Sequence, residues 1–365
     1  MATALVNGGG VAALCCAKLL GDKAWEVTLN VPPHRPSPTL VLHPLTVHLL
    51  DRVFGRAGEL LRGAHRLKRR RVSWGGAPPE VVALDCVVIR GDALTARLLA
   101  ALEGDAGRFD GGPAGDGARE AKDSGLNESR YDWAVHAGGR VTAALGGAGP
   151  VMPRRFGERR ALVSPARLRK GTDERASWME STPAGWLFLT PLGGGRAVLQ
   201  AVVPDPQASP EGAISGLLRS AKSIGSLVSD VTGPAEVFDC APRLLESPSG
   251  ARWIATGRPA CAYDPLCGDG TGYSVRGAIL TAAVLDAVAR GAERARHLEY
   301  YRDRLAHAFY GHLRACHSFY SAGGFDETWL PEINATADGL RRLGRSLASR
   351  GPLRYGLRGL ELVAL

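Results

Sequence analysis

The sequence ATALVNGGGVAALCCAKLLG at residues 2–21 decides the fold. Residues 2–6 are a short apolar run typical of a buried strand, and residues 11–20 follow as a helix that ends near Gly21. The turn between them has the spacing Gly8-x-Gly10-x-x-Ala13, in which the first glycine allows a tight turn and the second lets the backbone approach a pyrophosphate. The small third residue lets the helix lie close to the strand. This pattern predicts a dinucleotide-binding turn with phosphates at the helix N-terminus, and a plain glycine-rich turn is the alternative.

The second strand, at residues 26–29, ends without the acidic residue that usually holds a ribose hydroxyl in such a unit. Asn30 stands at that place, and its amide can hydrogen-bond a hydroxyl without adding a charge. Arg35 follows shortly afterwards, where we expect it to contact the adenosine side. Both residues are therefore predicted to bind the dinucleotide.

Composition excludes several classes of protein. The 365 residues suffice for two or three domains, and the 45% hydrophobic content excludes a chain that is disordered throughout. The net charge of +9 is concentrated at residues 66–71, but no aromatic platform or nucleic-acid motif accompanies it, so we expect no nucleic-acid partner. No apolar run reaches the roughly 18–20 residues of a membrane span. The seven scattered cysteines lack metal-type spacing, which favours a cytoplasmic protein without a metal site.

Three later stretches have the same alternation of strand, turn and helix. A strand at residues 87–89 leads through Arg90 into a helix that begins at Gly91. A strand at residues 133–136 leads to a Gly-Gly-Arg turn at residues 138–140. A strand at residues 253–257 leads through YDPLCGDGTG, residues 263–272, into a helix that runs to residue 289.

The middle of the chain has a different sequence pattern. Residues 158–250 contain short strands separated by turn residues, which predicts an antiparallel sheet. One hairpin at residues 185–196 places Trp186 and Phe188 on one face. Residues 104–128 are rich in glycine and charge and are predicted to be a surface insertion, whereas the pattern after residue 291 is helical.

Together these stretches, over about residues 2–330, resemble the FAD-dependent monooxygenase superfamily and, within it, the tryptophan-halogenase-like branch. The loop at residues 264–272 looks most like that of the flavoprotein monooxygenases that mature quinohemoprotein amine dehydrogenases. The resemblance implies an α/β fold with a Rossmann-like FAD-binding domain, an antiparallel-sheet substrate domain and a helical C-terminus. The expected boundaries are a first FAD-binding part at 1–157, a substrate domain at 158–250, a last FAD-binding part at 251–295 and a helical region at 296–365.

The resemblance also assigns residues to the cofactor. Besides Asn30 and Arg35, the residues that match FAD-binding positions are Gly8, Gly10, Ala13, Arg90, Gly138, Arg140, Asp264, Pro265, Gly268 and Gly270. One departure stands out: the family has Gly-Asp after the strand that precedes the late loop, where this chain has Gly257-Arg258. With Asn30, two acidic cofactor anchors are absent, so FAD is expected to be held less tightly.

The implied chemistry belongs to the flavin, which when reduced reacts with O2 to give a C4a-hydroperoxide, while the protein supplies position and desolvation. The expected substrate is a peptide side chain or an aromatic small molecule, with reduced nicotinamide or a flavin reductase as electron source. Asp269 is predicted to contact substrate or act as general base, and Cys267 is a second predicted catalytic residue, with a packing role as its alternative.

Two other functions remain open. A flavin-dependent halogenase would need a lysine near the flavin, and Lys68 lies in roughly the right region, although it sits in the arginine cluster. The hairpin with Trp186 and Phe188 only partly matches the halogenase signature, so oxygenation is favoured. The second alternative is a degenerate, non-catalytic relative that binds a protein partner through its arginine-rich face.

Overall fold

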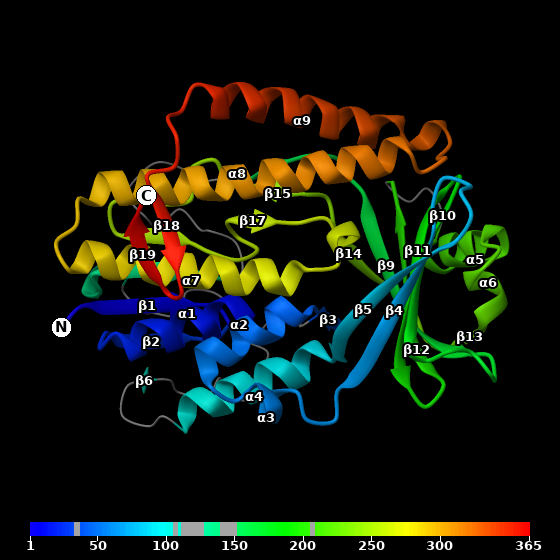
Figure 1. The fold of residues 1–365 in the computed structure, drawn as a ribbon, viewed down its shortest axis with the longest axis horizontal. Helices are drawn as coiled ribbons and strands as arrows, with labels where there is room; N and C mark the ends of the chain where they lie inside the picture. The colour runs from blue at the N-terminus through cyan, green and yellow to red at the C-terminus, as the bar shows by residue number, and fades with distance from the viewer. Residues whose placement is uncertain (33–36, 105–108, 111–127, 139–151, 205–208) are drawn as a thin grey trace.

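The structure is a computed structural model that describes residues 1–32, 37–104, 109–110, 128–138, 152–204 and 209–365. The molecule is elongated, with a parallel sheet near the two termini at one end and a larger twisted sheet at the other (Figure 1). The helices are α1 (Val11–Asp22), α2 (Pro44–Phe54), α3 (Ala57–Leu60), α4 (Gly91–Glu103), α5 (Pro210–Ser220), α6 (Ile224–Leu227), α7 (Gly270–Ala289), α8 (Arg294–Ser321) and α9 (Leu330–Ala348). Helices α7, α8 and α9 run along the length of the molecule between its two ends.

The parallel sheet is the Rossmann-like part of the molecule. In the described residues its strand order is β16 (Trp253–Ala255), β7 (Trp133–His136), β1 (Thr3–Asn7), β2 (Glu26–Asn30) and β6 (Phe109–Asp110). The central residues of β1, Ala4 to Val6, are buried on both faces, as expected for a parallel strand covered by helices. Helices α1 and α7 pack against each other on this sheet, and 12 residues of α7 are buried there. By length and composition α7 is also apolar enough to cross a membrane, but most of it lies inside the protein.

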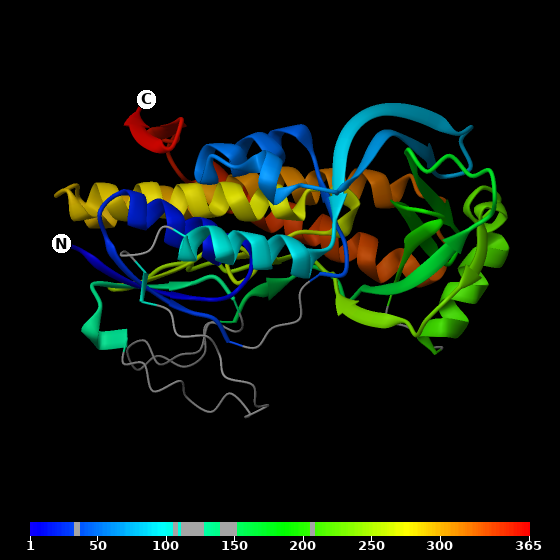
Figure 2. The same cartoon turned by 90° about the horizontal axis from the view of Figure 1, so that it is seen from below.

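The larger sheet is mixed rather than purely antiparallel. Among the described residues its order is β13 (Val228–Val231), β9 (Arg160–Leu168), β12 (Arg196–Val203), β11 (Gly185–Gly193), β10 (Ala176–Thr182), β4 (His65–Ser73), β5 (Glu80–Ile89) and β3 (Leu40–Leu42), with β14 (Glu236–Asp239) also paired to β9. Strands β4 and β10 run parallel, and the other pairs run antiparallel. Figure 2 shows β4 and β5 arching from the helical end across to this sheet.

The larger sheet therefore takes strands from two separate parts of the chain. The sequence placed it within residues 158–250, but β3, β4 and β5 come from residues 40–89. These strands reach from one end of the molecule to the other. The apolar end of β5, Val87 to Ile89, is buried, and its start at Glu80 is exposed. Pairing between strands so far apart in sequence leaves no local signal.

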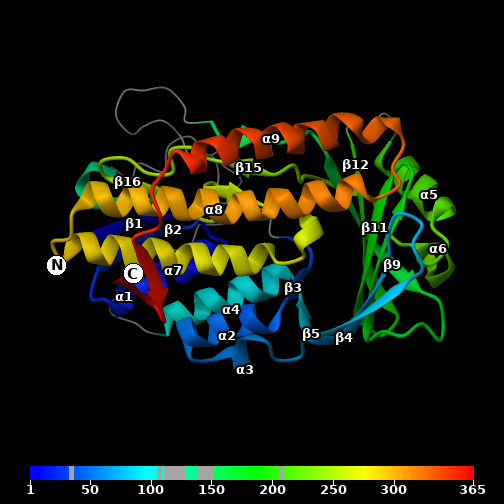
Figure 3. The same cartoon turned by 45° about the horizontal axis from the view of Figure 1, so that its top comes forward.

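The C-terminal helices form the third layer. Helices α7, α8 and α9 lie side by side along the long axis (Figure 3). The buried side chains Tyr300, Tyr301, Phe309 and Leu313 of α8 belong to the core of the parallel-sheet half. The chain ends in a hairpin, β18 (Tyr355–Arg358) and β19 (Glu361–Ala364), instead of remaining helical. Tyr355 packs on His297 and Tyr300 of α8, and this contact holds the hairpin to the helix.

Short elements connect these layers. They are the small sheet β17 (Cys261–Ala262), β15 (Arg243–Leu244) and β8 (Arg154–Arg155), and the 3-10 turns η1 (Glu128–Arg130), η2 (Pro265–Cys267) and η3 (Glu327–Trp329). Together the described residues form a Rossmann-like α/β unit joined to a large mixed sheet and C-terminal helices, so the predicted fold class is confirmed.

Candidate functional site: a cavity between the two sheets

A cavity of about 450 Å³ lies between the parallel sheet, the larger sheet and the start of α7. Its lining includes Gly10 to Ala12 from the first turn, Gly257 and Arg258 after β16, and residues 263–265, 268 and 270–271 from the late loop. The opening strand, turn and helix and the late Asp-Pro loop therefore contribute to one site, although some 250 residues of sequence separate them. The opposite wall is formed by strands β9, β11 and β12 of the larger sheet.

The first turn is built by close approach of backbones. Gly8 has a φ of +145°, and a β-carbon added there would lie 2.8 Å from Gly138 N and 3.2 Å from Ala13 Cβ. Only glycine fits such a position, which is the physical reason for this residue in the turn. At Gly10, by contrast, a β-carbon would meet nothing within 4 Å, so the space above the start of α1 is open. Gly8, Ala13 and Gly138 thus lie together, and their binding of a cofactor stays a prediction.

Two helix N-termini meet at this cavity. Helix α1 begins after Gly10 and α7 begins after Asp269, and at neither does a side chain cap the free N–H groups. Neither helix has an acidic residue in its first turn, and the charge of Asp269, the N-cap of α7, is offset by its ion pair with Arg276. Because a helix N-terminus carries about half a positive charge and unpaired donors, both ends are suited to an anionic ligand that spans them.

Hydrogen bonds within the late loop fix the conformation of the chain that leads into α7. The Asp264 carboxylate accepts from Leu266 N at 2.8 Å and so caps the short turn η2. Gly268 then adopts a φ of +61°, a left-handed conformation that favours glycine and turns the chain into α7. Asp264, Pro265, Gly268 and Gly270 all line the cavity, and the Asp264 carboxylate accepts a hydrogen bond from the buried Arg159.

Behind the loop lies a buried charge network that the sequence did not reveal. Arg159 is fully buried, and its guanidinium binds Asp264 through Nε and Glu332 through Nη1, each at 2.6 Å. Burial alone would lower the pKa of Arg159, but the Asp264 carboxylate raises it well above its usual value. The Tyr320 hydroxyl donates to both carboxylate oxygens of Asp264 at 2.9 Å. The late loop is therefore tied to α8 and α9 through charged groups that water does not reach.

A neutral histidine completes this network. The backbone N–H of Asp264 donates to His312 Nε2 at 2.9 Å, so that ring nitrogen carries no proton. Burial lowers the pKa of His312 to about 4, and the charge of Asp264 only partly opposes this shift. His312 therefore stays neutral at physiological pH and acts as an acceptor for the loop backbone.

The two predicted catalytic residues hold the loop in the described structure. Cys267 donates its thiol to Asp264 O, and burial raises the pKa of that thiol to about 12. The Asp269 carboxylate accepts from Thr46 Oγ1 at 2.8 Å and pairs with Arg276 at 2.7 Å. Asp269 is also absent from the lining of the cavity. Both catalytic roles stay predictions, and these contacts favour a structural role for each residue.

We predict that Cys267 resists alkylation in the folded protein. With a pKa near 12, only about one thiol in ten thousand is ionised at pH 8, and the thiolate is the reactive form. Iodoacetamide at pH 8 should leave the tryptic peptide 253–276, which contains Cys261 and Cys267, unmodified by mass spectrometry, because burial raises the pKa of both thiols to about 12. The same protein in urea should be labelled at both cysteines. Rapid labelling of Cys267 in the folded protein would instead indicate a reactive thiol.

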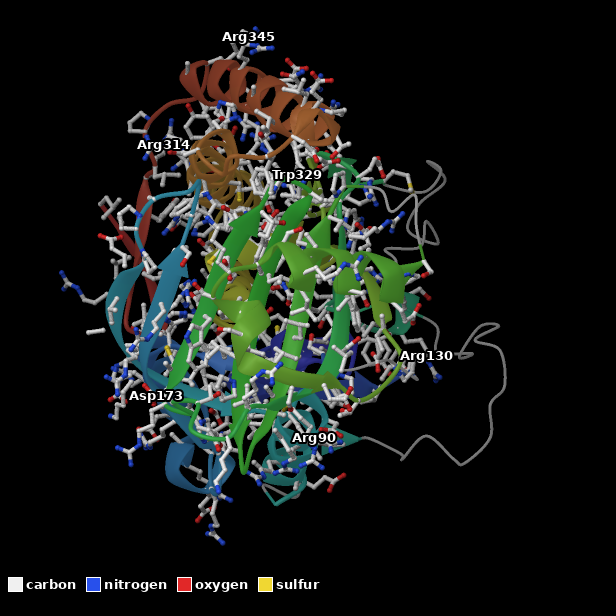
Figure 4. All side chains as sticks on the ribbon, turned by 90° about the vertical axis from the view of Figure 1, so that its right-hand side faces the viewer. Arg90, Arg130, Asp173, Arg314, Trp329 and Arg345 are labelled. Carbon is white, nitrogen blue, oxygen red and sulfur yellow. The ribbon has the colours of Figure 1, made fainter. Side chains whose placement is uncertain are left out.

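The remaining predicted cofactor residues are distributed unevenly. Asn30 donates to Asn7 Oδ1 at 2.9 Å at the carboxyl ends of β1 and β2, where the predicted ribose contact was expected. Arg90 is exposed, pairs with Asp92 and does not line the cavity, and Figure 4 shows it at the end of the sheet away from Trp329. Arg35 and Arg140 lie outside the described residues. Gly91, next to Arg90, does line the cavity.

Arg258 is a cavity residue that stands where the family pattern has an acid. Its Nη2 donates to the backbone oxygen of Asp239 at 2.8 Å, which fixes the guanidinium at the wall. A guanidinium matches phosphate geometry better than it matches a ribose hydroxyl. This residue therefore favours contact with a phosphate.

Lys68 lies away from the cavity. The backbone N–H groups of Lys68 and Arg69 both donate to Arg175 O, a bulge that shifts the alternation of side chains along β4. Lys68 is half exposed and pairs with Asp85 at 2.8 Å, while Arg69 pairs with Asp173, which Figure 4 shows at the outer side of the sheet. These carboxylates partly neutralise the exposed part of the arginine-rich face, whereas Arg70 of the same strand points inward and lies over the Phe188 ring.

The predicted hairpin contributes one aromatic ring to the wall on the larger sheet. Trp186 and Phe188 share one face of β11, and Phe188 lines the cavity. Trp186 belongs to a cluster of aromatic side chains that fills the space beneath α8 and α9. Its other members are Trp74, Tyr320, Phe325 and Trp329.

Comparison with known proteins places these observations on a known fold. No family model matches the sequence, and no curated protein matches it. The structure is similar to that of CmlS, a flavin-dependent halogenase, with a TM-score of 0.75 and 16% identity over 95% of this chain and 71% of that one. It is similar to the peptidyl tryptophan dihydroxylase QhpG, which is essential for tryptophylquinone cofactor biogenesis, with a TM-score of 0.68 and 19% identity over 100% and 86% of the chains.

A third similar structure is PqsL, a probable FAD-dependent monooxygenase from Pseudomonas aeruginosa, with a TM-score of 0.66 and 17% identity over 93% of this chain and 99% of that one. At these identities the comparisons show the fold. The chain has the fold shared by FAD-dependent halogenases and monooxygenases, and the resemblance seen in the sequence is confirmed as a structural match.

Proposed function

We propose that this protein binds FAD in the cavity between its two sheets and acts as a flavin-dependent monooxygenase. One observation carries the proposal: two uncapped helix N-termini, from the first and the last parts of the FAD-binding fold, line the same cavity. The substrate class that fits best is an aromatic small molecule or a peptide side chain, because the far wall of the cavity is formed by Phe188 and its apolar neighbours.

The residues present fit the cofactor at both ends. The open space above Gly10 and the free N–H groups of α1 suit a pyrophosphate, and Arg258 adds a fixed guanidinium nearby. The free N–H groups of α7 suit the side of the flavin that becomes negative on reduction. When it is bound and reduced, FAD would activate O2. The chain would orient it, exclude water and hold the loop at Pro265 to Gly268 through the Arg159 network.

The electron source would be reduced nicotinamide or a separate flavin reductase. Photoreduction of the FAD-loaded protein without oxygen reduces the flavin directly, so the experiment does not depend on which electron source is used. After mixing with O2, stopped-flow absorbance should show complete flavin reoxidation at a rate that depends on oxygen concentration. Bound flavin that remains reduced in oxygenated buffer would contradict an oxygenase and indicate a dehydrogenase or electron carrier.

A flavin halogenase is the second candidate, favoured by the similarity to CmlS. Lys68 distinguishes the halogenase from the monooxygenase, because a halogenase would need a lysine near the flavin. The half-exposed ammonium group of Lys68 is instead paired with Asp85. We predict that Lys68→Ala leaves product formation from an aromatic probe such as indole within about twofold, since surface ion pairs contribute little. Product mass with and without bromide provides the check. A bromide-dependent product that disappears in Lys68→Ala would establish the halogenase instead.

A further inference from the structure

The cavity wall on the larger sheet contains one amide and one hydroxyl among apolar side chains. Strands β9, β11 and β12 contribute the wall residues Ala161, Val163, Phe188, Thr190, Val198 and Gln200. Gln200 lies directly opposite Phe188 on β11 and opposite Val163 on β9. Side chains opposite each other on neighbouring strands point to the same face, so the Gln200 amide lies between an aromatic ring and a branched aliphatic side chain.

This amide has an unused donor. Gln200 Nε2 is shielded from water, and no acceptor in the described part of the chain lies within hydrogen-bond reach. A buried donor without an acceptor costs free energy, and leucine at this position would fit the apolar wall without that cost. The donor is therefore best explained by an acceptor that arrives with a ligand.

The charges around the cavity restrict that ligand further. Arg258 is the one cationic side chain among the described lining residues, and its Nη2 already donates to Asp239 O. The two lining carboxylates are also paired, Asp264 with Arg159 and Asp239 with Arg155. Arg70 of β4, however, holds its guanidinium 5.0 Å from the centre of the Phe188 ring, and its Nε and Nη2 have no partner among the described residues. The surroundings of Gln200 thus favour an electron-rich oxygen over an apolar group.

We propose that Gln200 is a specificity-determining residue whose Nε2 donates to a carbonyl-type oxygen on a flat aromatic substrate that lies near Phe188. This inference rests on the proposed function, since it assumes that FAD fills the end of the cavity at Gly10 and Gly268. A donor in an apolar pocket discriminates strongly, because a ligand without the acceptor leaves the buried amide unpaired.

Two probes of nearly equal size test the proposal. Acetophenone carries a carbonyl, and ethylbenzene replaces that group by a methylene. Their dissociation constants for the FAD-loaded protein are measured from changes in the flavin absorption spectrum. The wild-type protein should bind acetophenone about 10-fold more tightly than ethylbenzene. Gln200→Leu should bind the two equally, and Gln200→Glu should bind acetophenone least, because a carboxylate donates no hydrogen bond.

Thr190→Val is the matched control, because it removes a hydroxyl from the same wall and should keep the preference. Equal binding of the probes by the wild-type protein, or an unchanged preference in Gln200→Leu, would overturn the proposal. A fall in FAD affinity in Gln200→Leu with an unchanged probe ratio would assign the amide to the cofactor and would also overturn it. Failure of the proposed function is distinct, since the wild-type protein would then bind no FAD.

Discussion

Arg159→Met should lower the free energy of unfolding by about 3–5 kcal/mol. The substitution keeps most of the side-chain volume but removes the cation that binds Asp264 and Glu332, and both of these carboxylates are buried. Removing one partner of a buried ion pair is costly because the remaining charges have no water to solvate them. The same change should loosen the cavity loop, since Asp264 holds η2 through Leu266 N.

Urea denaturation of the apoprotein measures the first effect, and FAD affinity of the folded variant measures the second. Arg154→Met is the matched control, because Arg154 lies close to Arg159 in the sequence and forms an exposed ion pair with Glu246. Its cost should stay within about 1 kcal/mol. If Arg159→Met also cost less than 1 kcal/mol, the buried network would not support the late loop in the way described.

Gly10→Asp should abolish FAD binding while leaving the apoprotein folded. Gly10 is the N-cap of α1, with φ of −86° and ψ of 174°, a conformation that any residue adopts. An aspartate there would accept from the free N–H groups of α1, which stabilises the helix by about 0.5–2 kcal/mol. Its carboxylate would then occupy the same donors, and repel the same charge, as a pyrophosphate. We expect affinity for FAD to fall at least about 100-fold with an unchanged or raised apoprotein melting temperature.

Arg90→Ser makes the corresponding change at another helix. Arg90 is the N-cap of α4, it is exposed, and it does not line the cavity. A serine there can cap α4, so FAD affinity should remain within about threefold of the wild-type value. A large loss in Arg90→Ser together with normal binding by Gly10→Asp would move the phosphate site from α1 to α4.

The parts of the site that the sequence predicted share one property: each is encoded by residues close together in the chain. The turn at Gly8 to Ala13 and the loop at Asp264 to Gly270 follow from local backbone requirements for glycine and from the start of a helix. Their meeting in one cavity was expected from the resemblance rather than from spacing. The face shared by Trp186 and Phe188 likewise follows from strand alternation.

The parts that were missed depend on contacts between distant segments. Arg159 meets Asp264 and Glu332 across 105 and 173 residues, and an arginine in the sequence carries no mark of burial. The bulge at Lys68 depends on Arg175, so alternation along β4 could not reveal that Arg70, and not Lys68, lies over Phe188. The C-terminal hairpin depends on packing of Tyr355 against α8, which overrides the helical pattern before it.

The central claim is that α1 and α7 together hold one dinucleotide. Calorimetric titration of the apoprotein with FAD and, separately, with FMN tests it most directly, because FMN lacks the adenylate half that the α1 turn would hold. We expect one FAD per chain, bound at least about 100-fold more tightly than FMN. Equal affinity for the two flavins, or no heat of binding with either, would contradict the claim.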